Sequence, residues 1–183
     1  RIHDATLSGA PWHDAEAIRT ETKDWAWPRL FLDFETIQFA IPRWIGTALY
    51  EQVPFQFSAH VQKADGHVTH HSFLSIGGSD PRSACGEALA ALPAVGSIIA
   101  WNASFERGCI RALADQFDDL APVLNAMADR IVDFLPVVRR HYYHRDMKGS
   151  WSIKAVLPTV VPELAYATLE GGGNGKGAQL AYF

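Results

Sequence analysis

RLFLDFET, residues 29–36, is a tight run of apolar and aromatic residues that predicts a β-strand entered through Pro28. Successive side chains of a strand point to opposite faces of the sheet. The two leucines and Phe34 therefore share one face, while Asp33 and Glu35 share the other. The rest of the chain is best understood as a scaffold around this strand.

The pair of carboxylates on this strand has two interpretations. Asp33 and Glu35 are ~7 Å apart by strand rise alone, and two like charges within so apolar a run repel each other and lose hydration. A divalent cation between them removes both costs, so we expect them to be oxygen ligands of Mg²⁺ or Mn²⁺. The alternative is a solvated strand face or an edge strand, where acidic side chains are ordinary.

Length and composition bound the class of protein. The chain has 183 residues, 48% hydrophobic and 20% charged, which suits one globular domain with a substantial core. No apolar run approaches the ~20 residues of a membrane-spanning helix, and no signal peptide opens the chain, so we expect no membrane partner. Because the chain begins with Arg1 and not with Met, we expect a piece of a longer protein whose other domains are its partners.

The cysteines and histidines give no zinc motif. Cys85 and Cys109 lie in helix-like apolar patterns and are expected to be free buried thiols, which favours a reducing cytoplasm. His60, His70 and His71 lie on β-like runs and are expected at the surface. The net charge of −4 does not indicate a nucleic-acid binder, but local basic patches matter more for such binding than the total charge.

The order of the predicted elements indicates an α/β fold of the ribonuclease H-like class. Strands at 53–62 and 68–75 are joined by Asp65-Gly66, a strong hairpin signal, and complete an antiparallel three-strand meander. Later strands and helices alternate, which predicts parallel strands joined by crossovers, in a mixed sheet with helices on both faces. We expect these later elements as helix 80–92, strand 95–101, a helix from Asn102, strand 131–132 and helices from 134 and 152.

Three segments follow from this pattern. Residues 1–27 are expected to be a lead-in or linker, and residues 28–170 the ribonuclease H-like domain. Residues 171–183 are expected to be the glycine-rich tail of a truncated domain.

A further carboxylate, Glu106, lies in the first turn of a helix that begins directly after the predicted buried strand 95–101. A helix that begins there delivers its first side chains to one edge of the sheet. We expect Glu106 to be a third metal ligand, one position away from an apolar stripe of Phe105, Cys109, Ala112, Leu113 and Phe117. The alternative is that the glutamate only complements the helix dipole.

Together these motifs resemble those of the DEDD exonuclease superfamily. LDFET at 32–36 and NASFE at 102–106 resemble its first two motifs, and SIKAVL at 152–157 resembles the helix before its third. The chain is most similar to an uncharacterised bacterial domain-of-unknown-function family within that superfamily, on the further likeness of PFQ at 54–56 and GSWSIK at 149–154. The resemblance covers Trp27 to about Ala167.

The chain departs from the superfamily pattern in two places. The second motif ends in Glu106 where the pattern has aspartate, and the third motif, Tyr or His followed by Asp, is absent. We therefore expect the chain to stop short of the fourth ligand and the general base, which are not assigned. Asp133 is a possible additional ligand, but it is also well placed to cap the helix from Phe134.

A basic, aromatic stretch runs from Arg139 to Lys154. Its cations could neutralise phosphates and its tyrosines could stack on bases; the alternative is a solvated helix face with buried tyrosines. We also expect Thr36 to touch the substrate end. The residues assigned to nucleic-acid binding are Thr36, Asn102, Arg139, Arg140, Tyr142, Tyr143, Lys148 and Lys154.

The resemblance implies a metal-dependent 3′–5′ exonuclease-like phosphodiesterase acting on a single-stranded end. Asp33, Glu35 and Glu106 would be its catalytic metal ligands, with two Mg²⁺ or Mn²⁺ ions ~4 Å apart in a complete site. The second hypothesis is a non-catalytic nucleic-acid-binding or docking module of the same fold.

Overall fold

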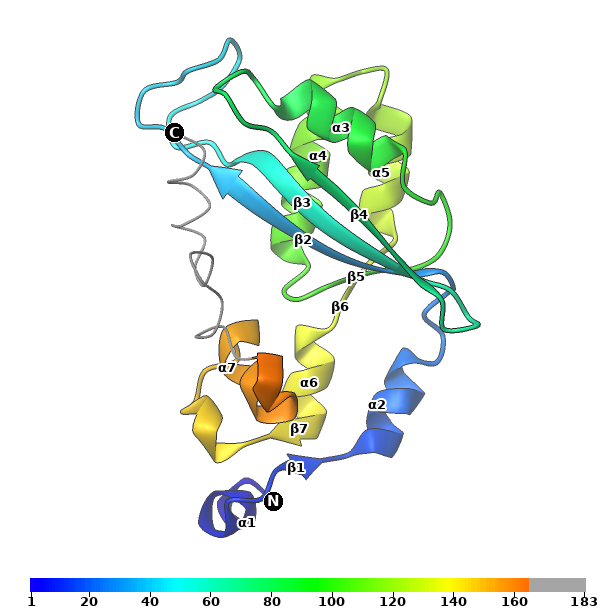
Figure 1. Cartoon of the computed structure of the whole chain (residues 1–183), viewed down its shortest axis with the longest axis vertical. Coiled ribbons are helices and arrows are strands. Elements are labelled where there is room, and N and C mark those ends of the chain that lie inside the picture. The colour runs from blue at the N-terminus through cyan, green and yellow to red at the C-terminus, as the bar shows by residue number, and fades with distance from the viewer. Residues whose placement is uncertain (165–183) are drawn as a thin grey trace.

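The computed structural model describes residues 1–164 and has a mixed α/β fold (Figure 1). A five-stranded sheet has the order β4-β3-β2-β5-β6. Strand β2 pairs antiparallel with β3, as β3 does with β4, whereas β2–β5 and β5–β6 are parallel. The predicted fold class, a meander followed by parallel strands, is confirmed. The strands are β2 (Arg29–Ile37), β3 (Val53–Gln62), β4 (Val68–Leu74), β5 (Ile98–Ala100) and β6 (Ile131–Asp133).

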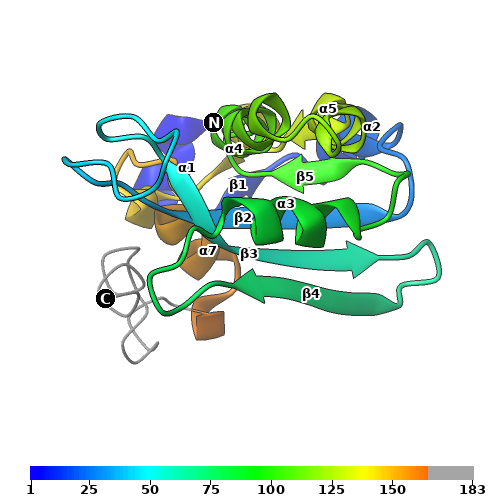
Figure 2. The same cartoon turned by 90° about the horizontal axis from the view of Figure 1, so that it is seen from above.

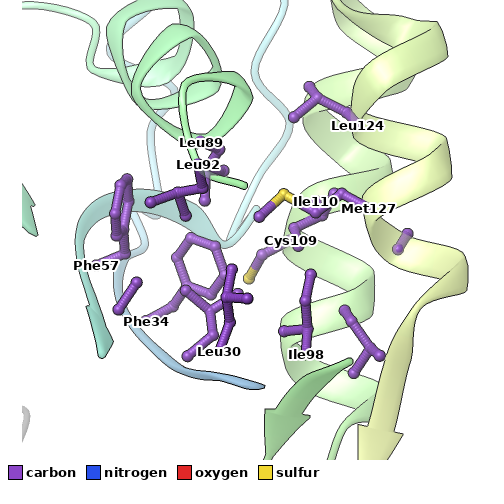
Figure 3. Packing of buried hydrophobic residues seen from close by; sticks show 14 of the residues in the cluster. Leu30, Phe34, Phe57, Leu89, Leu92, Ile98, Cys109, Ile110, Leu124 and Met127 are labelled. Atoms are coloured by element: carbon purple, nitrogen blue, oxygen red, sulfur yellow. The ribbon is translucent and has the colours of Figure 1, made fainter. Parts of the chain in front are cut away.

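One face of this sheet carries the main core. Helices α3 (Arg82–Ala90), α4 (Ser104–Gln116) and α5 (Ala121–Asp129) supply its other side. Figure 2 shows α3 in front of the strands, and Figure 3 shows the residues that meet between the layers. Helix α5 was not expected from the sequence, because Pro122 within its first turn and its short length obscure the helical period. The core includes Leu30, Phe34, Phe57, Leu89, Ile98, Ile110 and Leu124.

The buried face of α4 differs from the predicted stripe. Its buried residues are Glu106, Cys109, Ile110, Leu113 and Ala114, so Ala112 is exposed and Glu106 belongs to the buried face. The predicted placement of Glu106 beside the stripe is wrong, because the apolar pattern alone gives no weight to a carboxylate on the core side of a helix. The helix therefore carries this carboxylate into the protein.

The elements that follow β6 form a smaller group, in the lower half of Figure 1. Its own core consists of Val138, Met147 and Val156, against which Trp101, Phe134, Tyr142 and Trp151 pack. Figure 2 shows α7 behind the strands, on the opposite side from α3, so helices lie on both faces. The group contains α6 (Leu135–His141), β7 (Tyr142–Tyr143), η1 (Arg145–Met147), α7 (Ile153–Val160) and η2 (Pro162–Leu164).

The segment 1–27 is more ordered than a linker. It forms α1 (Ile2–Ser8), β1 (Trp12–His13) and α2 (Ala15–Thr22), and β1 pairs antiparallel with β7. Glu21 on α2 forms a salt bridge with Arg140 and accepts a 2.6 Å hydrogen bond from His141. The expected lead-in is thus attached to the part of the chain that follows β6. The β1–β7 pairing was not predicted because two-residue strands are too short to show a pattern in the sequence.

The loop between β2 and β3 is fixed by a buried arginine. Arg82 is only 2% exposed and donates to Ile45 O at 2.7 Å, to Gln116 Oε1 at 2.7 Å and to both carboxylate oxygens of Asp80. Trp44, in the same loop, packs against a small apolar cluster of Ile37, Val53 and Phe55. These contacts attach the middle of the loop to the rest of the fold.

The two thiols, Cys85 and Cys109, are free and buried, as predicted. None of the helices in residues 1–164 has the length and apolar character needed to cross a membrane. The predicted glycine-rich tail, 171–183, and the last residues of the predicted domain lie outside the described residues.

Candidate functional site

Strand β2 places Asp33 and Glu35 on the face opposite the main core. Leu32 and Phe34 are buried, while Asp33 is exposed and Glu35 is partly exposed, as the predicted alternation requires. The pairing with β3 shifts register between Glu35 and Thr36, and from there on both Thr36 and Ile37 are buried. A bulge at this point re-aims the chain at the end of the strand that carries the acidic pair.

The two carboxylates on β2 affect each other. Partial loss of hydration raises the pKa of Glu35, and the charge of Asp33 raises it further. The pKa of Asp33 is also raised by desolvation, although its side chain reaches the surface. Lys154, in the first turn of α7, opposes both shifts by its positive charge. The structure thus brings a cation from the basic stretch to the acidic pair.

Glu106 lies on the core side of the sheet, close enough to Asp33 for the two charges to interact. Helix α4 begins almost directly after β5, and the connecting turn has Asn102 in the left-handed region, with φ of 69°. The turn delivers Glu106 to a position where it is 3% exposed and its Oε2 atom has no hydrogen-bond partner. Burial raises the pKa of Glu106 to about 7, and the charges of Asp33 and Asp133 contribute to the rise.

These residues fit a hard divalent cation by their chemistry. Carboxylate oxygens are the ligands of Mg²⁺ and Mn²⁺, and an unpartnered buried carboxylate oxygen is rare without a ligand or water. Asp33 is the common partner, since its charge acts on both Glu35 and Glu106. Within residues 1–164, however, no group of three or more His, Cys, Asp or Glu side chains is arranged to hold a metal ion. The three carboxylates share one electrostatic environment without forming a closed cage.

Asp133 has a structural role. Its Oδ1 atom accepts hydrogen bonds from the backbone N–H groups of Leu135, at 3.0 Å, and Asn102, at 3.2 Å. It therefore satisfies the beginning of α6, as predicted, and also ties the β5–α4 turn to the end of β6. The charge of Asp133 nevertheless acts on Glu106, which keeps it near the site.

Several residues of the basic aromatic stretch are engaged in contacts within the protein. Arg140 pairs with Glu21, and the Arg139 guanidinium lies 5.9 Å from the ring centre of Trp151. The Tyr142 hydroxyl is 2.8 Å from Thr159 Oγ1, and the Tyr143 hydroxyl is 2.8 Å from Thr6 Oγ1. Lys148 is exposed, in a left-handed conformation.

Two further placements concern the predicted nucleic-acid contacts. Thr36 is buried, 8% exposed, immediately after the acidic pair. Asn102 does not cap α4 by its side chain; its Oδ1 atom accepts a 3.1 Å hydrogen bond from Ser104 Oγ. The left-handed backbone of Asn102 itself turns the chain from strand to helix.

Sequence reasoning missed the buried position of Arg82. An arginine is seldom buried, and only the carboxylate two residues earlier, Asp80, could have indicated a local partner. The proximity of Lys154 to Asp33 was also not predicted, because the two residues belong to elements far apart in sequence.

Comparison with known proteins identifies a family. Searches of curated proteins and of solved structures found no match. A family model described as Domain of unknown function (DUF2779) matches residues 30–152, which are 123 of the 183 residues and include β2, α4 and the carboxylates on them. The chain therefore belongs to the family described as Domain of unknown function (DUF2779).

Proposed function

We propose that this chain is a metal-dependent phosphodiesterase of the DEDD exonuclease type, acting on nucleic acid in the 3′–5′ direction. The observation that carries the proposal is the buried Glu106 carboxylate, with its unpartnered Oε2 atom, in the electrostatic environment of Asp33. The motif resemblance supports it, because LDFET and NASFE are the segments that supply these carboxylates.

Each residue has a distinct task in this proposal. Asp33, Glu35 and Glu106 would hold Mg²⁺ or Mn²⁺, which supplies an activated water and stabilises charge on the leaving oxygen when bound. Lys154 offers positive charge beside the acidic pair, where it can balance a phosphate of the substrate. Thr36, which follows Glu35 directly, would contact the substrate end through its hydroxyl or its backbone.

A second candidate is a nucleic-acid-binding module without catalysis. The observation that favours it is the lack, within residues 1–164, of a preformed group of metal-ligating side chains. In this case the carboxylates are remnants of the fold, and cleavage belongs to another protein or domain.

Isothermal titration calorimetry with Mn²⁺ tests the proposal on the 183-residue chain. We expect specific binding by the wild type and its loss in Asp33→Asn and Glu106→Gln. Asp115→Asn serves as the matched control, since Asp115 is an exposed carboxylate on α4. Wild-type binding that persists in both site variants would contradict the proposal.

Cleavage of labelled single-stranded DNA and RNA, with Mn²⁺ and then with chelator, separates the two candidates. Chelator-sensitive shortening that Asp33→Asn abolishes supports the phosphodiesterase. Binding without any shortening supports the module.

A further inference from the structure

The face of the sheet that carries Asp33 also carries an exposed row of rings. Register places Phe31 opposite His60, and His60 opposite His70, on three adjacent strands. Phe31 is 42% exposed, and both histidines are exposed. The two imidazole rings are stacked, with centres 4.4 Å apart and planes 19° apart. We refer to Phe31, His60 and His70 as the ring row.

The ring row has a defined ring orientation and a defined distance from Asp33. The Ser58 hydroxyl is 2.9 Å from His70 Nε2, which fixes the orientation of that ring. The neighbouring row along the strands consists of Asp33, Ser58 and Ser72. Two residues along a strand correspond to ~7 Å, so the ring row lies about one nucleotide step of an extended strand from Asp33.

The charges on this face are ordered along β2. Arg29 has the same orientation as Phe31 and Asp33, because it precedes them by even numbers of residues. Its guanidinium lies 4.2 Å from the ring centre of Trp27 and donates to Thr22 O at 3.0 Å. Along β2, this face therefore carries the Arg29 guanidinium, then the ring row, then the acidic pair.

This order matches the chemistry of an unpaired nucleic-acid strand. Cations hold phosphates, and exposed rings stack on bases whatever their sequence, which requires that the base faces be free of a duplex. An ordinary cross-strand histidine pair would explain the contact between His60 and His70, but not the continuation of the row through Phe31 toward the acidic pair.

We propose that single-stranded nucleic acid crosses this face, with bases stacked on Phe31 and on the exposed side of the stacked His60–His70 pair, and the reacting end directed to Asp33 and Glu35. The inference rests on the proposed function for its direction, since it assigns the substrate class and the approach to the same carboxylates. The stacking surface itself is independent of metal, because it consists of Phe31, His60 and His70 alone.

Fluorescence anisotropy with labelled oligo(dT) and oligo(U), in chelator, tests the stacking surface without cleavage. We expect Phe31→Ala, His60→Ala and His70→Ala each to weaken binding by roughly fivefold to a hundredfold. Phe31→Trp should retain the affinity of the wild type. His71→Ala is the matched control, because His71 is exposed on the same strand and its side chain points to the opposite face. A DNA hairpin without free bases should bind more weakly than oligo(dT).

The outcomes separate this inference from the proposed function. Wild-type affinity in all three alanine variants, or absence of oligonucleotide binding by the wild type, would overturn the inference. Photocrosslinking of an iodouracil oligonucleotide to Phe31, His60 or His70 supports it. If Asp33→Asn keeps full Mn²⁺ binding while the ring-row variants lose the oligonucleotide, the proposed function fails and the single-strand surface stands.

Discussion

Burial raises the pKa of Glu106, on α4, and the charge of Asp33, on β2, raises it further, although the two residues belong to different motifs of the chain. The strand presents its carboxylate from the open face, and the helix presents the other from the core side. This convergence connects the fold to the proposed chemistry, because a pair that disfavours its own ionisation gains from a cation.

Glu106 makes the stability of the metal-free protein depend on pH. Its pKa rises from 4.5 to about 7 on folding, so the folded state binds the proton more tightly than the unfolded state. The free energy of unfolding should therefore fall as the pH rises from about 4.5 to about 7, by up to about 3 kcal/mol. Glu106→Gln should flatten this part of the profile, as measured by urea denaturation in chelator. Asp115→Asn should leave it unchanged; parallel profiles for wild type and Glu106→Gln would contradict the expectation.

Glu21 should have the opposite dependence. Hydrogen bonds from Arg140 and His141 lower its pKa to about 2, so the unfolded state binds the proton more tightly. The contribution of Glu21 to stability is present above pH 4.5 and should be lost as the pH falls toward 2. Denaturation of Glu21→Gln should be less sensitive to pH in this range than that of the wild type. Glu16→Gln, an exposed change on the same helix, is the control, and identical profiles for both variants would argue against the contact.

Arg82→Ala should destabilise the protein by about 2–4 kcal/mol, because it leaves Asp80, Gln116 and the Ile45 carbonyl without their buried donor. Arg111→Ala removes an exposed pair with Asp129 and should cost less than about 1 kcal/mol. Thermal and urea denaturation measure both. Equal effects of the two substitutions would show that the burial of Arg82 does not matter.

Gly96 is required by a close approach of the backbone. An added Cβ atom would lie 1.9 Å from Pro28 O, and φ is +91°. Gly96→Ala should therefore prevent the normal packing of the chain before β2 and cost more than about 3 kcal/mol. Gly77→Ala has a similar φ of +92° with no neighbouring atom, so it isolates the conformational cost, about 1 kcal/mol. Similar melting temperatures for the two variants would contradict this distinction.

The sequence predicted those parts of the fold that are governed by local periodicity. The alternation in β2 and the turn at Asp65-Gly66 predicted the meander, and the apolar pattern after Asn102 predicted α4. The two-residue pairing of β1 with β7 has no period to detect, so the role of residues 1–27 emerged only from the structure.

For the candidate site, local pattern gave the residues and tertiary structure gave their surroundings. Alternation placed Asp33 and Glu35 on one face, which the structure confirms. The burial of Glu106 depends on how α4 is rotated against the sheet, and the neighbourhood of Lys154 on how α7 returns to it. Both are set by long-range packing, to which a single sequence gives no direct access.

The left-handed conformation of Asn102 explains the residue type at one motif position without reference to a substrate. Asparagine and glycine tolerate a positive φ, whereas β-branched residues do so only with strain. A chain that makes the same change of direction from strand to helix does so with least strain when one of these residues stands at this position. The asparagine that opens NASFE is therefore favoured by main-chain handedness, and the same preference would hold even in a relative that cleaves nothing.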